Sequence, residues 1–236
     1  LINYLPMVEQ VYFAGGEPLI MEEHYKILKA LIDLGKANSV RLIYNTNFTQ
    51  MSYKNLNVLD LWPEFKDVSV GASLDAMGPR AELMRNGTVW ADVERNREQM
   101  LKKCPQVDFY ISATLSAFNC RHLVDFHNDW VSKGFVRYQD WNMNVVQDPL
   151  YYRADILPQT MKTELTELYK SHIENIKTVD TIGRASNGFE SAVKFINATD
   201  NSHLLPKFKQ YVKLLDDRRN QKTVDVFPEL KEILDE

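Results

Sequence analysis

The sequence Val11-Tyr12-Phe13-Ala14-Gly15-Gly16-Glu17-Pro18 places a carboxylate directly after two glycines and a short apolar run. The apolar run predicts a buried strand, and the pattern from Glu22 to Leu34 predicts a helix, so Glu17 lies where a strand leads into a helix. In α/β proteins ligands bind beyond the carboxyl ends of the strands. Glycines let the backbone approach a ligand closely, and Pro18 fixes the turn. Glu17 is therefore a candidate ligand-binding residue, and the alternative is a tight turn with a solvated glutamate.

Polar residues also end the next predicted strands. The strand pattern at 40–44 runs into Asn45-Thr46-Asn47, and the pattern at 68–74 ends at Asp75. Short polar side chains of this kind suit turns. Two carboxylates at one edge of a sheet, Glu17 and Asp75, could also serve as the general acid and base of a hydrolase or lyase.

Strands and helices must alternate to bring these residues to one edge. Polar strand ends recur about every 30 residues, which is the length of a strand, a crossover helix and two loops. Further strands are expected at 107–115 and 135–141, and helices at 54–61, 88–103 and 120–133. Five strands are too few for a closed eight-stranded barrel. The sequence predicts an α/β fold with a parallel sheet or a (β/α) barrel.

The pattern changes after Pro149, where only helices are expected. They are predicted at 158–176, 188–197, 204–218 and 227–234. We find no Gly/Ser-rich linker between the two regions. We therefore predict a barrel core over residues 1–150 and a helical C-terminal extension over residues 151–236 that packs on the barrel.

Composition limits the class of protein. The chain has 236 residues, is 44% hydrophobic and 25% charged, and carries a formal net charge of −4. That charge gives no basic field for nucleic acid or anionic lipid, and no apolar run reaches the length of a membrane span. Two cysteines, Cys104 and Cys120, make no disulfide framework, which favours the cytoplasm. His122 and His127 are misaligned for a shared metal, and the other histidines stand alone in the sequence.

Four motifs together resemble the radical S-adenosylmethionine (SAM) superfamily, in the branch near the SPASM and twitch-domain proteins. They are Ala14-Gly15-Gly16-Glu17-Pro18-Leu19, Tyr44-Asn45-Thr46-Asn47, Ser73-Leu74-Asp75 with Arg85, and Ser112-Ala113-Thr114 with Asn119. The resemblance covers nearly the whole chain. It implies a partial (β/α)6 barrel of the TIM-like kind, of which this chain would hold the second to sixth strands.

The resemblance also implies roles for individual residues. The Gly15-Gly16-Glu17-Pro18 turn would receive the amino group of SAM, with Glu17 and backbone carbonyls as acceptors, and Asn45 would be a further SAM-binding residue. Ser73 and Arg85 would hold its carboxylate, for which the planar fork of arginine is suited. Asn47 and Asp75 would contact the ribose hydroxyls. The strand around Trp141 and Asn142 would approach the adenine.

The sequence departs from the family in one respect. Members of the family bind a 4Fe-4S cluster through the cysteines of a CxxxCxxC loop. This sequence lacks that loop. Cys104 and Cys120 have no companions at ligand spacing, so both are interpreted as structural, and no metal ligand is predicted. The C-terminal third contains no cysteine for an auxiliary cluster of the twitch type. Because the chain begins just before the family's second strand, the resemblance implies that the cluster loop lies upstream.

The leading hypothesis is a radical SAM enzyme that, with its upstream cluster, generates a 5′-deoxyadenosyl radical. Its substrate is not specified by the sequence, and peptide modification is the commonest use in this branch. The alternatives are a barrel that binds a ligand without catalysis after losing its cluster, and the acid–base enzyme described above. A CxxxCxxC motif shortly upstream in the coding sequence would favour the first, and a natural start codon near Leu1 the second.

Overall fold

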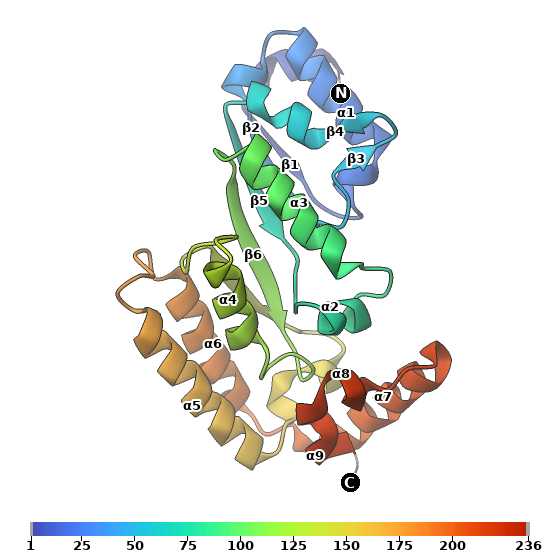
Figure 1. Ribbon diagram of the computed structural model, residues 1–236, viewed down its shortest axis with the longest axis vertical. Helices are drawn as coiled ribbons and strands as arrows, with labels where there is room; N and C mark the ends of the chain where they lie inside the picture. Colours follow the sequence, from blue (N-terminus) through green and yellow to red (C-terminus); the bar gives the residue numbers. More distant parts are fainter. Residues whose placement is uncertain (1, 235–236) are drawn as a thin grey trace. The chain divides into compact units, whose positions relative to one another are not determined.

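The computed structural model describes residues 2–234, and these contain a five-stranded sheet with strand order β1-β2-β5-β6-β7 (Figure 1). The strands are β1 (Gln10–Phe13), β2 (Arg41–Thr46), β5 (Asp67–Ala72), β6 (Asp108–Leu115) and β7 (Trp141–Val145). The pairs β1–β2, β2–β5 and β5–β6 are parallel. The predicted α/β fold with a mainly parallel sheet is confirmed. The numbering of these strands as the second to sixth of a barrel stays a prediction.

The chain forms two compact units. Unit 1 comprises Leu1–Leu74 and Val89–Ile111, and unit 2 comprises Asp75–Thr88 and Ser112–Glu236. Strand β6 therefore begins in unit 1 and ends in unit 2. These units are defined by compactness alone, and the functional division expected at residue 150 stays a prediction.

In unit 1, the helices α1 (Glu22–Asp33) and α3 (Trp90–Lys103) make the crossovers between parallel strands. Glu22 and Glu23 lie in the first turn of α1, where the helix dipole favours negative charge. The helix ends before Gly35, whose φ of +66° suits a residue without a side chain. The largest fully buried side chains of this unit are Tyr25, Tyr44, Phe48 and Trp62.

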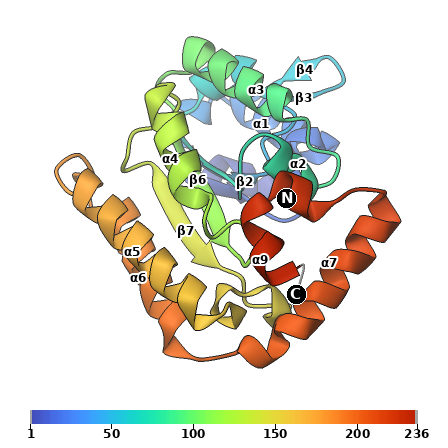
Figure 2. The ribbon, with the colours of Figure 1, turned by 60° about the horizontal axis from the view of Figure 1, so that its bottom comes forward.

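Unit 2 contains β7 and the remaining helices. They are α2 (Pro79–Met84), α4 (Leu123–Ser132), α5 (Gln159–Ile176), α6 (Arg184–Ala198), α7 (Leu205–Arg219), α8 (Thr223–Val226) and α9 (Lys231–Leu234). Helices α5 and α6 lie side by side, and α6 also packs on β7 (Figures 1 and 2). Gly188 of α6 permits this, because a Cβ there would lie 3.1 Å from Cβ of Met143. The buried aromatic residues Phe126, Trp130, Trp141, Tyr169 and Phe189 fill the core of the unit.

Two predicted elements are wrong. The helix expected at 54–61 is a hairpin of β3 (Ser52–Tyr53) and β4 (Leu56–Asn57) followed by 3-10 turns. Lys54 adopts a left-handed conformation with φ of +53°, and the Asn57 side chain accepts a hydrogen bond from the Leu59 amide. Such local side-chain bonds compete with a helix.

The strand expected at 135–141 begins only at Trp141. Phe135 and Val136 are buried, but they precede a turn in which the Asp140 carboxylate accepts the Arg137 backbone N–H at 2.9 Å. Asn142 therefore lies inside β7 and not beyond its end.

Candidate functional site

The Gly-Gly-Glu-Pro turn follows β1 in unit 1. Gly15 and Gly16 have φ values of +79° and +58°, which only glycine adopts without strain. An added Cβ would meet no atom within 4 Å at Gly15, and only the Met21 sulfur at 4.0 Å at Gly16. The glycines are therefore required by backbone conformation, and the space beside them is open.

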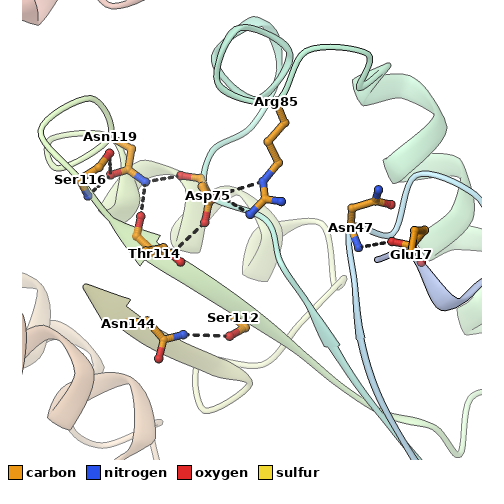
Figure 3. Close-up of polar contacts among 9 residues, drawn as sticks. All are labelled: Glu17, Asn47, Asp75, Arg85, Ser112, Thr114, Ser116, Asn119 and Asn144. Carbon is orange, nitrogen blue, oxygen red and sulfur yellow. Dashed lines mark hydrogen bonds and ion pairs between the residues drawn. The ribbon is translucent and has the colours of Figure 1, made fainter. Parts of the chain in front are cut away.

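Glu17 is held by donors from two directions. Its Oε1 accepts from the Leu19 amide at 3.2 Å and from the Thr46 hydroxyl at 2.7 Å. Its Oε2 accepts from the Asn47 amide at 2.7 Å (Figure 3). Thr46 is the last residue of β2, and Asn47 follows it. The hydrogen bonds of Glu17 therefore join the carboxyl ends of β1 and β2. A carboxylate offers about four acceptor positions, and three are used here.

The neighbouring predicted residues have partners of their own. The Asn45 side chain donates to the Tyr12 hydroxyl at 2.6 Å. The Asn47 side-chain oxygen accepts from the amide and hydroxyl of Thr49 at 3.0 and 2.7 Å. The Ser73 amide donates to the Thr46 carbonyl at 2.8 Å. Pro18 is buried at the start of a short 3-10 helix that Glu17 caps. The predicted residues of unit 1 therefore lie near the carboxyl ends of β1, β2 and β5.

In unit 2, Asp75 and Arg85 form an ion pair. Nε and Nη2 of Arg85 donate to Oδ2 of Asp75 at 2.9 and 2.6 Å, and Oδ1 accepts from the Thr114 amide at 2.8 Å (Figure 3). The Asp75 side chain is 11% exposed and that of Arg85 is 39% exposed. The buried carboxylate is thus neutralised by an arginine that still reaches solvent.

A buried asparagine supports this pair. Nδ2 of Asn119 donates to the backbone carbonyls of Asp75 and Thr114, and its Oδ1 accepts from the amide and hydroxyl of Ser116. Asn119 is fully buried. It therefore fixes the backbone that carries Asp75 relative to the end of β6.

The structure thus brings Gly15, Gly16, Glu17, Pro18 and Asn47 together in unit 1, and Asp75 with Arg85 in unit 2. Asn142 takes no part in the contacts of Asp75 or Arg85 described above, and the adjacent contact on β7 is from Asn144 to the Ser112 hydroxyl at 3.1 Å. Sequence reasoning did not assign roles to Thr46, Ser116 or Asn119. Thr46 belongs to the Tyr44-Asn45-Thr46-Asn47 motif, but the sequence did not indicate that its hydroxyl binds Glu17.

The cysteines do not form a cluster site. Cys104 and Cys120 are free and buried, and their sulfurs lie 3.2 Å from the Leu59 carbonyl and 3.6 Å from the Ala117 carbonyl. Burial raises the pKa of both thiols, that of Cys120 to about 12, so neither is a ready thiolate. Over residues 2–234 no group of three metal-ligating side chains occurs. The residues described here therefore do not fit a 4Fe-4S cluster.

Histidines that stand alone in the sequence have partners in the fold. Nε2 of His24 lies 2.9 Å from the Tyr44 hydroxyl, and Nδ1 of His127 lies 3.0 Å from Nε2 of His172. Burial lowers the pKa of His127 to about 3 and that of His172 to about 4. His127 and His172 are therefore neutral core residues that pair with each other, a contact that the sequence did not indicate, whereas Nδ1 of His24 is buried without a hydrogen-bond partner among the described residues.

The fold resembles solved structures of anSMEcpe, an anaerobic sulfatase-maturating enzyme of the radical SAM class. The form with bound AdoMet and Cp18Cys peptide matches with a TM-score of 0.51 and 21% identity, over 72% of this chain and 48% of that chain. The form with bound AdoMet alone has a TM-score of 0.52 and 20% identity, over 75% of this chain and 50% of that chain. The chain thus spans about half the length of these structures.

At this identity the likeness is one of fold. No family model matches the chain, and no curated protein matches it. Within the described part of the chain, no helix has both the length and the apolar character needed to cross a membrane.

Proposed function

We propose that this chain is part of a radical SAM enzyme, that it binds SAM, and that its substrate is a peptide. The observation that carries the proposal is the Gly-Gly-Glu-Pro turn, whose two glycines hold positive φ beside open space at the end of a parallel strand. The likeness of fold to AdoMet-bound structures supports SAM as the ligand, and the peptides bound in two of them support the substrate class.

In unit 1, the turn is proposed to receive the amino group of SAM. An ammonium carries three donors and needs acceptors for each. The remaining acceptor position of Glu17 would give a charge-assisted bond, and the glycine carbonyls would supply the others. The fixed orientation of Glu17, held by Thr46 and Asn47, would pre-arrange this contact.

In unit 2, Arg85 is proposed to hold the SAM carboxylate. Its contacts with Asp75 use two of the five N–H groups of the guanidinium. The Arg85 side chain is 39% exposed, and the remaining N–H groups of its fork suit a second carboxylate. We assign Ser73 to the same carboxylate, Asn47 and Asp75 to the ribose, and Asn142 to the adenine, as the sequence resemblance implies. SAM, once bound, supplies the radical chemistry of its class.

Titration calorimetry with SAM tests this proposal. Arg85→Ala should weaken binding by about 1.5–3 kcal/mol, the scale of a charged hydrogen bond. Arg85→Lys should recover part of that loss, because a point charge lacks the fork. Arg137→Ala is the matched control, since Nε and Nη2 of Arg137 hold the buried carboxylate of Asp140 in the same unit. If all three variants bind SAM as tightly as the unsubstituted chain does, the assignment of Arg85 is refuted.

A second candidate is a module that binds SAM without cleaving it. Both cysteines are buried in separate contacts with backbone carbonyls, so this chain offers no thiolate for a cluster, and cleavage would depend on ligands from elsewhere in the protein. The candidates differ in whether the intact protein supplies cluster ligands. Cleavage of SAM by the full-length protein after reconstitution of its cluster would exclude this candidate.

A further inference from the structure

Arg85 lies directly after a very short helix. Helix α2 spans six residues, Pro79–Met84, and Arg85 is its C-terminal cap, with its amide donating to the Ala81 carbonyl at 2.9 Å. A helix of this length is not stable by itself. Contacts from elsewhere in the chain must therefore hold α2 and the side chain that follows it.

Those contacts come from the C-terminal part of unit 2. We define the C-terminal clasp as residues Arg219–Glu229, which include α8. Helix α8 lies beside α2 (Figures 1 and 2). Nη1 of Arg219 donates to the Leu83 carbonyl at 2.9 Å, near the end of α2. The clasp thus reaches the helix within two residues of Arg85.

Arg80, at the start of α2, makes the strongest link to the clasp. Its Nε donates to the Val226 carbonyl at 3.0 Å, and its Nη2 pairs with Oε2 of Glu229 at 3.0 Å. The guanidinium also lies over the buried Phe227 ring at 5.3 Å. The side chains of Arg80 and Glu229 are only 22% and 14% exposed. A charge pair shielded to this degree is costly to break from one side.

Arg80 also reaches the chain that leads out of Asp75. Its Nη1 lies 2.5 Å from Nδ1 of His122, and Nε2 of His122 lies 3.2 Å from the Met77 amide. A neutral imidazole accepts at one nitrogen only, so these two contacts are alternatives. Burial, with the Arg80 charge, lowers the pKa of His122 to about 4, which keeps the ring neutral. In either tautomer His122 ties the 77–80 segment to α4.

We propose that Arg80 is a positioning residue for SAM recognition, which couples the C-terminal clasp to the orientation of Arg85. This inference rests on the proposed function, because it assigns a purpose to the Arg85 fork. Asp75, whose backbone Asn119 fixes, holds the Arg85 side chain, and Arg80 with the clasp holds the helix that precedes it. The clasp, more than 130 residues away in sequence from α2, therefore influences how well Arg85 meets a carboxylate.

Hydrogen exchange of the whole chain gives the first test. Arg80→Met keeps the aliphatic stem and removes the guanidinium. We expect exchange of amides in 78–88 to accelerate about tenfold, because local opening governs it. Arg121→Met is the matched control, since Arg121 pairs with Glu164 and Glu232 in the same unit and makes no described contact with α2. It should leave exchange in 78–88 unchanged. Unchanged exchange in Arg80→Met would overturn the inference.

A double-mutant cycle gives the second test. Arg80→Met should weaken SAM binding about tenfold in the unsubstituted chain but less than about twofold in the Arg85→Ala background, because the two residues would act through one contact. Equal losses in both backgrounds would overturn the inference. Glu229→Gln serves as the alternative variant if Arg80→Met folds poorly. It keeps an acceptor for Arg80 but loses the charge, and it should weaken SAM binding by about threefold.

The two proposals fail in different ways. If the unsubstituted chain binds no SAM, or if Arg85→Ala leaves the affinity unchanged, the proposed function fails. The exchange measurement would still decide whether Arg80 and the clasp order the segment that carries Arg85.

Discussion

Replacing Gly15 by alanine separates the folding role of the Gly-Gly-Glu-Pro turn from its binding role. Gly15 has a φ of +79°, where a residue with a Cβ costs about 1–2 kcal/mol. No atom would lie within 4 Å of the new Cβ, so no steric cost is added. The reduced freedom of the unfolded chain returns about 0.4–1 kcal/mol. We expect a net loss of about 1 kcal/mol in the free energy of unfolding.

Gly35 provides the control for this substitution. It lies in the same unit after α1, has a φ of +66°, and also has open space around its would-be Cβ. Gly35→Ala should therefore cost the same stability as Gly15→Ala, and each should lower Tm by about 2–4 °C in a chain of this size. Only Gly15→Ala should weaken SAM binding, by about tenfold or more, because the turn would no longer present its carbonyls in one conformation.

Thermal unfolding followed by circular dichroism gives the stability comparison, and calorimetry at a temperature where all variants are folded gives the affinities. Matched loss of stability with equal SAM affinity in both variants would refute a binding role for the turn. If Gly15→Ala lowers Tm several times more than Gly35→Ala does, other atoms of the folded protein must meet the new Cβ at position 15.

Two further predictions concern the cysteines and the histidines. Incubated with iron and sulfide without oxygen, this chain should develop no absorbance band at about 400 nm and should not cleave SAM, because its two buried thiols cannot supply three grouped thiolates; stoichiometric iron uptake with formation of 5′-deoxyadenosine would contradict the cysteine argument. The free energy of unfolding should fall as pH drops from about 6.5 towards about 4. Burial lowers the pKa of His24, His122 and His172 to about 4 in the folded protein. The unfolded chain therefore binds protons first as the pH falls, and the stability present above pH 6.5 is lost. Urea unfolding across this range should show the decrease, and His172→Gln should make the slope shallower; a curve without slope would contradict it.

The parts of the fold that the sequence revealed are those set by local pattern. The apolar runs ending in Gly15, Asn45-Thr46-Asn47 and Asp75 mark β1, β2 and β5, because polar and small residues end parallel strands at one edge. The acidic start of α1 and the glycine after it mark that helix in the same way. These features depend on neighbours in the chain, and therefore a single sequence displays them.

The parts that were missed depend on contacts between distant residues. The apolar pair Phe135 and Val136 indicated a strand, but the Asp140 carboxylate closes a turn around Arg137 instead. The ion pair of Arg80 with Glu229 joins residues 149 positions apart, and neither residue type nor spacing announces it. Fixation of Glu17 by the Thr46 hydroxyl likewise needed the register of β1 and β2.

The same contacts bear on the choice between binding and acid–base chemistry for the two carboxylates. Glu17 and Asp75 each accept three hydrogen bonds, from Leu19, Thr46 and Asn47 in one case and from Arg85 and Thr114 in the other. A general base must direct a lone pair at the proton that it removes, and a general acid must carry a proton of its own. With about one acceptor position left on each, these carboxyl groups are held in one orientation by their donors. Acceptors held in this way suit recognition of an ammonium or a hydroxyl, so the arrangement favours a ligand-binding role over a hydrolase or lyase.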